Sequence, residues 1–292
     1  MNFEQFLQYI FSGITNGSIY ALTALGFTLV FNATQIINFA QGQMVMLGGM
    51  TAIAFHGAGL PLWACFSGAV VIVMVVSMGL EQVAIRPLLS KGVLSQIIAT
   101  VGASFVFETA AMLIWGRDAL ALPAFSGETP IGVAGATVVP QTLWVVGLTI
   151  VIVVGLQIFY RSSLFGKAVR ACAVNPSAAR LQGISYRRVV LFSFALSGAI
   201  SAAAGVMIAP ISFMSYSSGT LLGLKGFAAA TLGGLGNPVG AVLGGFILGI
   251  LEALGVGVVS AGYKDAIAFV VLLLVLFLRP AGLLGAKVVT RQ

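Results

Sequence analysis

Three ionisable side chains lie within long apolar stretches of the sequence: Glu108, Lys225 and Glu252. An ionised group inside a bilayer is costly, so such residues face a bundle interior or a water-filled path and are functional candidates. Each lies about eight residues from the same side of the membrane, or roughly 12 Å along a helix that rises 1.5 Å per residue. This shared depth allows Lys225 to pair with a carboxylate. The three residues are therefore candidates either for a transport pathway or for a structural ion pair.

Amide side chains form a second candidate group. Asn38, Gln41 and Gln43 lie at the start of the apolar stretch 36–55. Asn38 and Gln41 are three positions apart and would share one face of a helix. Because amides in hydrocarbon need hydrogen-bonding partners, we expect this face inside the bundle. It would either line a pathway or join helices.

Glycines mark a third region, residues 223–249. The pairs Gly240-x-x-x-Gly244 and Gly245-x-x-x-Gly249 predict close helix packing. The tripeptide Gly236-Asn237-Pro238 predicts a helix break just before them. A tight helix crossing explains this pattern, and so does an unwound segment that lines a cavity.

The sequence lacks the motifs of several enzyme classes. It has no P-loop, HExxH or GxSxG motif, and its single histidine, His56, cannot serve several sites. Two cysteines and one distant histidine are too few for a metal site, and we expect no disulfide between Cys65 and Cys172. We therefore expect no catalysis and no cofactor in this chain. Driven transport would take its energy from an ion gradient or from a separate ATPase.

Composition defines the class. Of 292 residues, 59% are apolar and 7% charged, and the mean hydropathy is +1.10, whereas soluble domains have about 25% charged residues. The chain is predicted to be an all-α, polytopic membrane protein with one transmembrane domain over residues 1–292. The net charge of +7 comes without a nucleic-acid-binding module. We expect about eight transmembrane helices and a broken or half-crossing helix at 218–235, the stretches being 6–30, 36–55, 61–84, 95–116, 140–160, 189–212, 218–235, 238–259 and 264–280.

Charge predicts the orientation. The loop 161–188 holds six of the fourteen basic residues and no acid, so it should lie in the cytoplasm. The same rule places Arg86 and Lys91 in the cytoplasm. Counting spans back from Arg86 places the N-terminus outside. The loop 117–139, with the mixed charges Arg117, Asp118 and Glu128, would be outside. The basic tail, with Arg279, Lys287 and Arg291, would place the C-terminus in the cytoplasm.

The basic loop contains a short predicted helix. Asn175-Pro176 can start it, Ser177, Ala178 and Ala179 can continue it, and Gly183 can end it. Such a helix, held between two membrane spans, suits a partner protein that pushes on those spans. The alternative is a solvated loop that only obeys the charge rule.

Four stretches together resemble the permease subunits of branched-chain amino acid ABC importers, in the LivH-like branch. They are GSIYALTALGFTLVFNATQIINFAQGQMVMLGG (17–49), GKAVRACAVNPSAARLQGI (166–184), SGAISAAAGVMIAP (197–210) and GLKGFAAATLGGLGNPVGAVLGGFILGILE (223–252). They lie at the beginning, middle and end of the chain, so the resemblance extends over its full length.

The resemblance implies that the basic loop is the coupling helix that docks on a cytoplasmic ATPase. Importers generally have Glu-Ala-Ala-x-x-x-Gly there, and this chain keeps the alanines and the glycine but has Ser177 at the Glu position. The LivH-like branch does not require that Glu. The residues implied in coupling are Arg170, Asn175, Pro176, Ser177, Ala178, Ala179, Arg180 and Gly183.

The resemblance also implies the partners and the mechanism. The complex would contain a second homologous permease, two ATPase subunits that bind ATP and Mg, and an extracytoplasmic binding protein, in the bacterial inner membrane. Transport would proceed by alternating access, with half of the pathway on this chain.

Other functions remain open on the sequence. Similar permeases move urea, short amides or aromatic acids. An ion-coupled transporter would use Glu108 or Glu252 without ATP, and a purely structural subunit is the third alternative.

Overall fold

The computed structural model describes residues 2–89, 91–127, 129–133, 135–279 and 281–285. Glu128, Lys287 and Arg291, used above for the orientation, lie outside these residues. The helices are α1 (Phe3–Thr34), α2 (Gln41–Gly57), α3 (Leu62–Leu80), α4 (Val93–Trp115), α5 (Pro140–Ser162), α6 (Leu164–Val174), α7 (Pro176–Leu181), α8 (Tyr186–Ile208), α9 (Ser218–Gly233), α10 (Pro238–Val258) and α11 (Lys264–Leu278).

Short elements complete the fold. A π-helical turn, η1 (Glu81–Ile85), and a 3-10 turn, η2 (Arg86–Leu88), extend α3, and a second 3-10 turn, η3 (Ala261–Tyr263), precedes α11. The strands β1 (Ile131–Val133) and β2 (Ala136–Val138) pair antiparallel, with Gly132 opposite Thr137.

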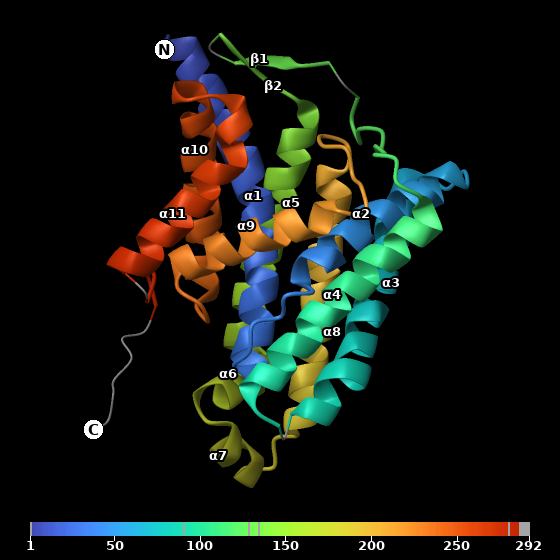
Figure 1. Ribbon diagram of the computed structural model, residues 1–292, viewed down its shortest axis with the longest axis vertical. Helices are drawn as coiled ribbons and strands as arrows, with labels where there is room; N and C mark the ends of the chain where they lie inside the picture. The colour runs from blue at the N-terminus through green and yellow to red at the C-terminus, as the bar shows by residue number, and fades with distance from the viewer. Residues whose placement is uncertain (1, 90, 128, 134, 280, 286–292) are drawn as a thin grey trace.

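The helices form one bundle with a transverse element. In Figure 1, α1, α5, α8 and α10 run along the long axis, whereas α9 lies across them near mid-height. The N-terminus and the β1–β2 hairpin lie at one end of the bundle, and α6 and α7 lie at the other. The polytopic all-α fold predicted from the composition is confirmed.

The expected count of about eight spanning helices is not confirmed. Within the described residues, seven helices are long and apolar enough to cross a membrane. The helices α2 and α9 fall short, with 17 and 16 residues. A 16-residue helix is about 24 Å long, less than the roughly 30 Å of a hydrocarbon core. The doubtful stretch 218–235 is therefore a short helix, as expected for a half-crossing.

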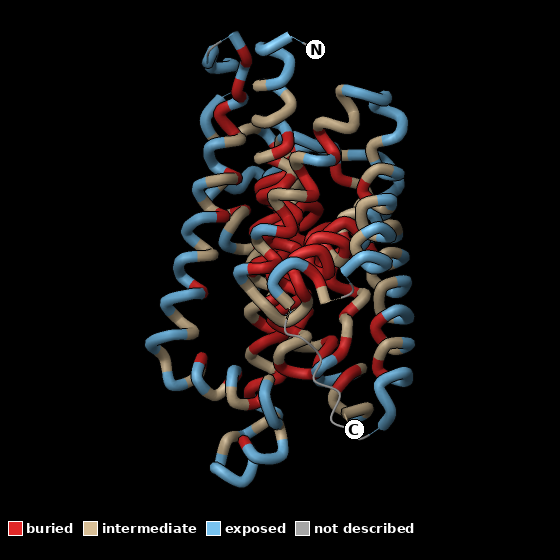
Figure 2. Tube along the Cα trace, turned by 90° about the vertical axis from the view of Figure 1, so that its left-hand side faces the viewer, coloured by how far each residue is buried: buried red, intermediate tan, exposed pale blue. Residues whose placement is uncertain are grey.

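Burial divides the bundle into an inner and an outer part. The inner helices α1 and α8 are largely buried, whereas α4 and α11 are mostly exposed. Only 11% of the residues in the most apolar part of α4 are buried, and only 6% of those in the stretch Ala261–Leu278, which contains α11. Figure 2 shows the same division, with buried residues at the centre and exposed residues on the outer helices. Apolar side chains on these exposed faces fit contact with lipid or with another membrane subunit.

Glycine backbones bring α1 and α10 into direct contact. A Cβ atom added at Gly13 would lie 2.8 Å from the Ile250 Cα, and one at Gly17 would lie 2.9 Å from the Phe246 Cα. On α10, Gly249 meets Gly13 and Gly17, and Gly245 meets Ala21. The other glycine pair, Gly240 and Gly244, packs on α9 against Gly233 and Ala229. The two glycine motifs thus hold two different neighbours.

The connection between α1 and α2 departs from the helix expected at 36–55. The helix α2 begins at Gln41, and Asn38 lies in the non-helical segment before it. The first helix ends at Thr34, and the following Gln35 has a left-handed φ of 58° that cannot continue an α-helix. Asn38 and Gln41 therefore do not share a helix face.

Replacing Gly249 with leucine should destabilise the bundle. A Cβ atom there would lie 2.5 Å from the Gly13 carbonyl oxygen, and overpacking of a tight contact costs about 1–3 kcal/mol or more. The thermal midpoint of the purified protein in detergent should fall by several degrees. Gly147→Leu on α5 is the matched control, because a Cβ there meets no described atom within 4 Å. Equal midpoints for the two variants would contradict the packing role.

Candidate functional site

The transverse helix α9 carries two polar residues that belong to different clusters. Thr220, near its first turn, contacts Glu108 on α4 and Gln43 on α2. Lys225 contacts Glu252 on α10 and Asp265 on α11. The three ionisable residues singled out from the sequence therefore do not form one site.

The first cluster is organised by the Gln43 amide. Its Nε2 donates to the Ser104 hydroxyl at 3.1 Å, to the Thr220 hydroxyl at 3.2 Å and to the Glu108 carboxylate at 3.4 Å. The Thr220 hydroxyl also donates to Glu108, at 3.0 Å. Gln43 is buried, whereas Glu108 is half-buried and Thr220 exposed. The cluster therefore reaches from the bundle interior to the outer face of α4 and α9.

A cavity of about 160 Å³ adjoins this cluster. Ser104 and Thr220 form its polar side, and the other lining residues are apolar: Phe27, Phe39, Val101, Phe105, Gly223, Leu224 and Phe227. The arrangement combines an aromatic pocket with hydroxyl and carboxylate groups. It could hold a small molecule that has one apolar and one polar end.

The second cluster is an ion-pair network around Glu252. This fully buried carboxylate lies 3.2 Å from the Lys225 amine and 3.4 Å from the Lys264 amine, and the Tyr20 hydroxyl donates to it at 2.9 Å. Lys225 also pairs with Asp265, at 2.6 Å. The expected pair of Lys225 with a carboxylate is present, and its partner is Glu252 rather than Glu108. The network connects α1, α9, α10 and α11.

The remaining amides join helices. The Ser197 hydroxyl on α8 donates to the side-chain oxygen Oε1 of Gln41 at 2.9 Å and also to the backbone carbonyl of Gly26 on α1. The Gln41 Nε2 donates to the Ser201 hydroxyl, and Asn38 donates to Gln41 at 3.4 Å. Asn38 and Gln41 are both buried, as the sequence predicted. These contacts connect α2 to α1 and α8.

The short predicted helix is present as α7. The Asn175 side chain accepts the Ala178 backbone N–H at 3.0 Å, and Pro176 occupies the first turn. Gly183 follows the helix with a left-handed φ of 79°. Ser177, Ala178 and Arg180 are exposed, whereas Ala179 is buried in the cluster formed with α6 and α8. Ala179 therefore anchors the helix and offers no surface to a partner.

The exposed surface of the segment α6–α7 includes large apolar side chains. Leu181 on α7 is 88% exposed, and Val174 at the end of α6 is 87% exposed. Arg170 is exposed on α6, where it lines a separate hollow that also contains Arg161. Cys172 is buried, which raises the pKa of its thiol, although the nearby Arg180 partly opposes this shift.

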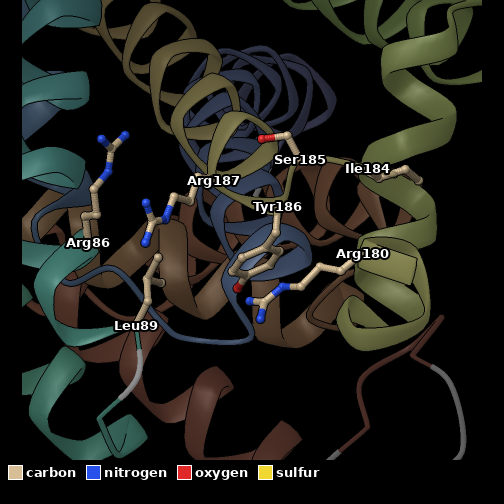
Figure 3. A pocket seen from close by; sticks show the side chains of 7 residues that line it. All are labelled: Arg86, Leu89, Arg180, Ile184, Ser185, Tyr186 and Arg187. Carbon is tan, nitrogen blue, oxygen red and sulfur yellow. The ribbon is translucent and has the colours of Figure 1, made fainter. Parts of the chain in front are cut away.

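A basic pocket of about 470 Å³ lies beside α7 (Figure 3). Arg86 contributes to it from η2 and Leu89 from the residue after η2. The other lining residues come from α7, the α7–α8 connection and the start of α8: Arg180, Ile184, Ser185, Tyr186 and Arg187. The Arg180 guanidinium lies 4.5 Å from the centre of the Tyr186 ring, and Arg86 pairs with the buried Glu81 at 3.0 Å. The pocket joins two basic regions that the charge pattern placed on one side of the membrane.

Sequence reasoning missed several of these partners. Ser104, Ser197, Ser201 and Thr220 carry no signal of their own, because hydroxyls in apolar helices commonly bond the backbone of their own helix. Glu81 and Arg86 are five positions apart, a spacing that does not place residues together on an α-helix. They meet because η1 is a π-helical turn, in which the Arg86 N–H bonds the Glu81 carbonyl.

A polytopic helical bundle with polar clusters at membrane depth, and with a basic short helix at one end, has the features of a membrane transport subunit. The chain belongs to the family of permease components of branched-chain amino acid transport systems, whose model matches residues 9–276. It is therefore a transport permease and a multi-pass membrane protein.

Similar proteins support this assignment over the full length. The high-affinity branched-chain amino acid transport system permease protein LivH of Escherichia coli K12 is 37% identical, over 97% of this chain and 96% of LivH. The corresponding protein BraD of Pseudomonas aeruginosa is 33% identical, over 96% of each chain. The ribose import permease protein RbsC of Escherichia coli K12 is more distant, at 27% identity over 91% of this chain and 83% of RbsC.

Replacing Lys225 with methionine should destabilise the protein. The change removes a cation from a fully buried carboxylate, and breaking a buried ion pair costs about 3–5 kcal/mol. Because Lys264 still contacts Glu252, we expect the lower end of this range. The thermal midpoint should fall well below that of Lys91→Met, the same change at an exposed loop residue. Similar midpoints would mean that the pair contributes little.

Proposed function

We propose that this chain is the permease subunit of an ABC importer for branched-chain, hydrophobic amino acids in the bacterial inner membrane. The observation that carries the proposal is the match to LivH over nearly the whole of both chains. The chain would form half of the translocation pathway, beside a second homologous permease. Two cytoplasmic ATPase subunits would bind ATP and Mg, and an extracytoplasmic binding protein would deliver the substrate.

The outer face of α4 and α9 is our candidate for this half of the pathway. Glu108 is half-buried on a helix whose neighbouring side chains, such as Phe105, are exposed. A carboxylate at membrane depth faces protein or water rather than lipid. A second permease that covers this face would enclose Glu108, Thr220 and the adjoining cavity between the two chains.

The segment α6–α7 is our candidate for the coupling site. Exposed Leu181 and Val174 would contact the ATPase, since large apolar side chains exposed to water mark interaction surfaces. Ala179 fixes α7 to the core, and α8 leads from there to Ser197 and Ser201, which hold Gln41. A displacement of α7 would thus reach α2 through one continuous helix of 23 residues.

An ion-coupled mechanism has less support. Of its two candidate carboxylates, Glu252 is a poor choice for exchanging a cation or proton, because it is already held by two lysines and a tyrosine hydroxyl, and only Glu108 is left for this role. This neutralised network fits a structural role.

Leu181→Asp should uncouple ATP hydrolysis from transport. A charge at this exposed position would oppose docking without disturbing the fold. In proteoliposomes with the complete transporter, substrate-stimulated ATP turnover should fall at least tenfold.

Val133→Asp is the matched control, because it makes the same kind of change on the exposed strand β1. We expect normal turnover for this variant. Normal turnover with Leu181→Asp would remove the coupling role of α7. Purification of the native chain without any ATPase or second permease would contradict the importer assignment itself.

Cysteine labelling should show the proposed orientation. Cys65 and Cys172 are both buried, so background labelling by a membrane-impermeant maleimide should be low. Ser177→Cys should react only in inside-out vesicles, and Thr129→Cys only in right-side-out vesicles or intact spheroplasts. The reverse pattern would overturn the assignment of the N-terminus to the outside and of the loop 161–188 to the cytoplasm.

A further inference from the structure

Glu108 differs from the other carboxylates in the helical core. Glu81 pairs with Arg86, and Glu252 pairs with Lys225 and Lys264. Within the described part of the chain, no lysine or arginine pairs with Glu108. Its hydrogen bonds come from two uncharged groups, the Thr220 hydroxyl and the Gln43 amide, and both reach the same oxygen, Oε2. The carboxylate is thus held in place with its charge uncompensated within this chain.

The neighbouring cavity complements this charge. Four phenylalanines, Phe27, Phe39, Phe105 and Phe227, provide most of its aromatic surface, and Ser104 and Thr220 form the side toward Glu108. Its volume of about 160 Å³ is about five times the roughly 30 Å³ that one water occupies in the liquid. That space suits a branched aliphatic group of three or four carbons.

We propose that Glu108, Thr220 and this aromatic cavity form one half of a binding site for α-amino acids with aliphatic side chains. Glu108 accepts hydrogen bonds from the α-ammonium group, and the Ser104 and Thr220 hydroxyls serve as further acceptors. The side chain occupies the phenylalanine-lined cavity. Gln43 is a positioning residue, because its amide and the Thr220 hydroxyl both donate to Oε2, and Oε1 is then the oxygen that would accept from the ligand. This inference rests on the proposed function.

The sign of the charge selects among substrates. An ammonium group gains from a carboxylate in a site of low dielectric constant. Urea and short amides carry no charge and gain no such attraction, and an aromatic acid without an amino group is repelled. The half-site therefore favours amino acids over the other cargoes that similar permeases carry.

Glu108→Gln tests this inference in the complete transporter reconstituted in proteoliposomes. With radiolabelled L-leucine as the probe, the KM of ATP-driven uptake should rise at least tenfold. Co-purification of the second permease should not change. Glu108→Asp should restore part of the affinity, and Glu4→Gln, the same change at an exposed residue near the N-terminus, should have no effect.

Direct binding provides a second measurement. Binding of labelled L-leucine to the purified complex without the binding protein should weaken at least tenfold in Glu108→Gln. Phe105→Ala should weaken the binding of leucine more than that of alanine, because the cavity holds the larger side chain. An equal loss of binding for both amino acids would mean that the ligand side chain does not occupy the cavity.

Two results would overturn the half-site. One is an unchanged KM in Glu108→Gln. The other is loss of the second permease from that variant, which would mean that Glu108 pairs with a cation of the partner chain. Failure of the proposed function would appear differently, because the wild-type complex itself would then carry no leucine with ATP.

Discussion

The contact between α1 and α10 is the constraint on which the rest of the structure depends. Gly13, Gly17 and Ala21 on one helix face Gly245 and Gly249 on the other, so the two backbones touch without intervening side chains. Lipid provides no hydrophobic force between helices, and such close approach replaces it with van der Waals contact. With α1 fixed at the centre, α8 and α9 pack on its remaining faces.

The transverse position of α9 depends on the same kind of close packing between small residues, and it brings together the two polar clusters of the protein. Gly219 and Gly223 approach α2 at Gln43 and Gly42, while Gly226 approaches Thr23 of α1. A helix inserted in this way presents Thr220 to α4 on one side and Lys225 to α10 on the other. One cluster is neutralised and centred on the buried Glu252 and Lys225. The other is charged, half-open and adjacent to an aromatic cavity, which is why we assign the transport role to it.

The sequence allowed seven spanning helices, the short α9, the glycine contacts and the α7 helix to be predicted, because each depends on local signals. Hydropathy over about 20 residues, a small residue every fourth position, and an Asn-Pro start followed by a glycine are all readable from the chain.

Which side chains contact each other could not be predicted from the sequence. Equal depth could not decide whether Lys225 pairs with Glu108 or Glu252, because depth leaves the direction around the bundle axis undefined. The predicted start of the second helix at residue 36 was wrong, because the chain turns at Gln35 and α2 begins only at Gln41. Gln35 is neither glycine nor proline, so its left-handed conformation could not be predicted from its residue type.

The π-helical turn η1 makes the number of residues in this part of the chain as important as their identity. A π-turn holds one residue more than an α-turn, and each residue of an α-helix rotates the chain by about 100°. Deleting one position among 82–84 would restore α-helical register and place Arg86 four positions after Glu81. It would also rotate everything that follows, including the connection to α4, relative to the core. A length change of one residue would thus change the direction in which the chain enters the basic pocket beside α7, even though no charged residue had been removed.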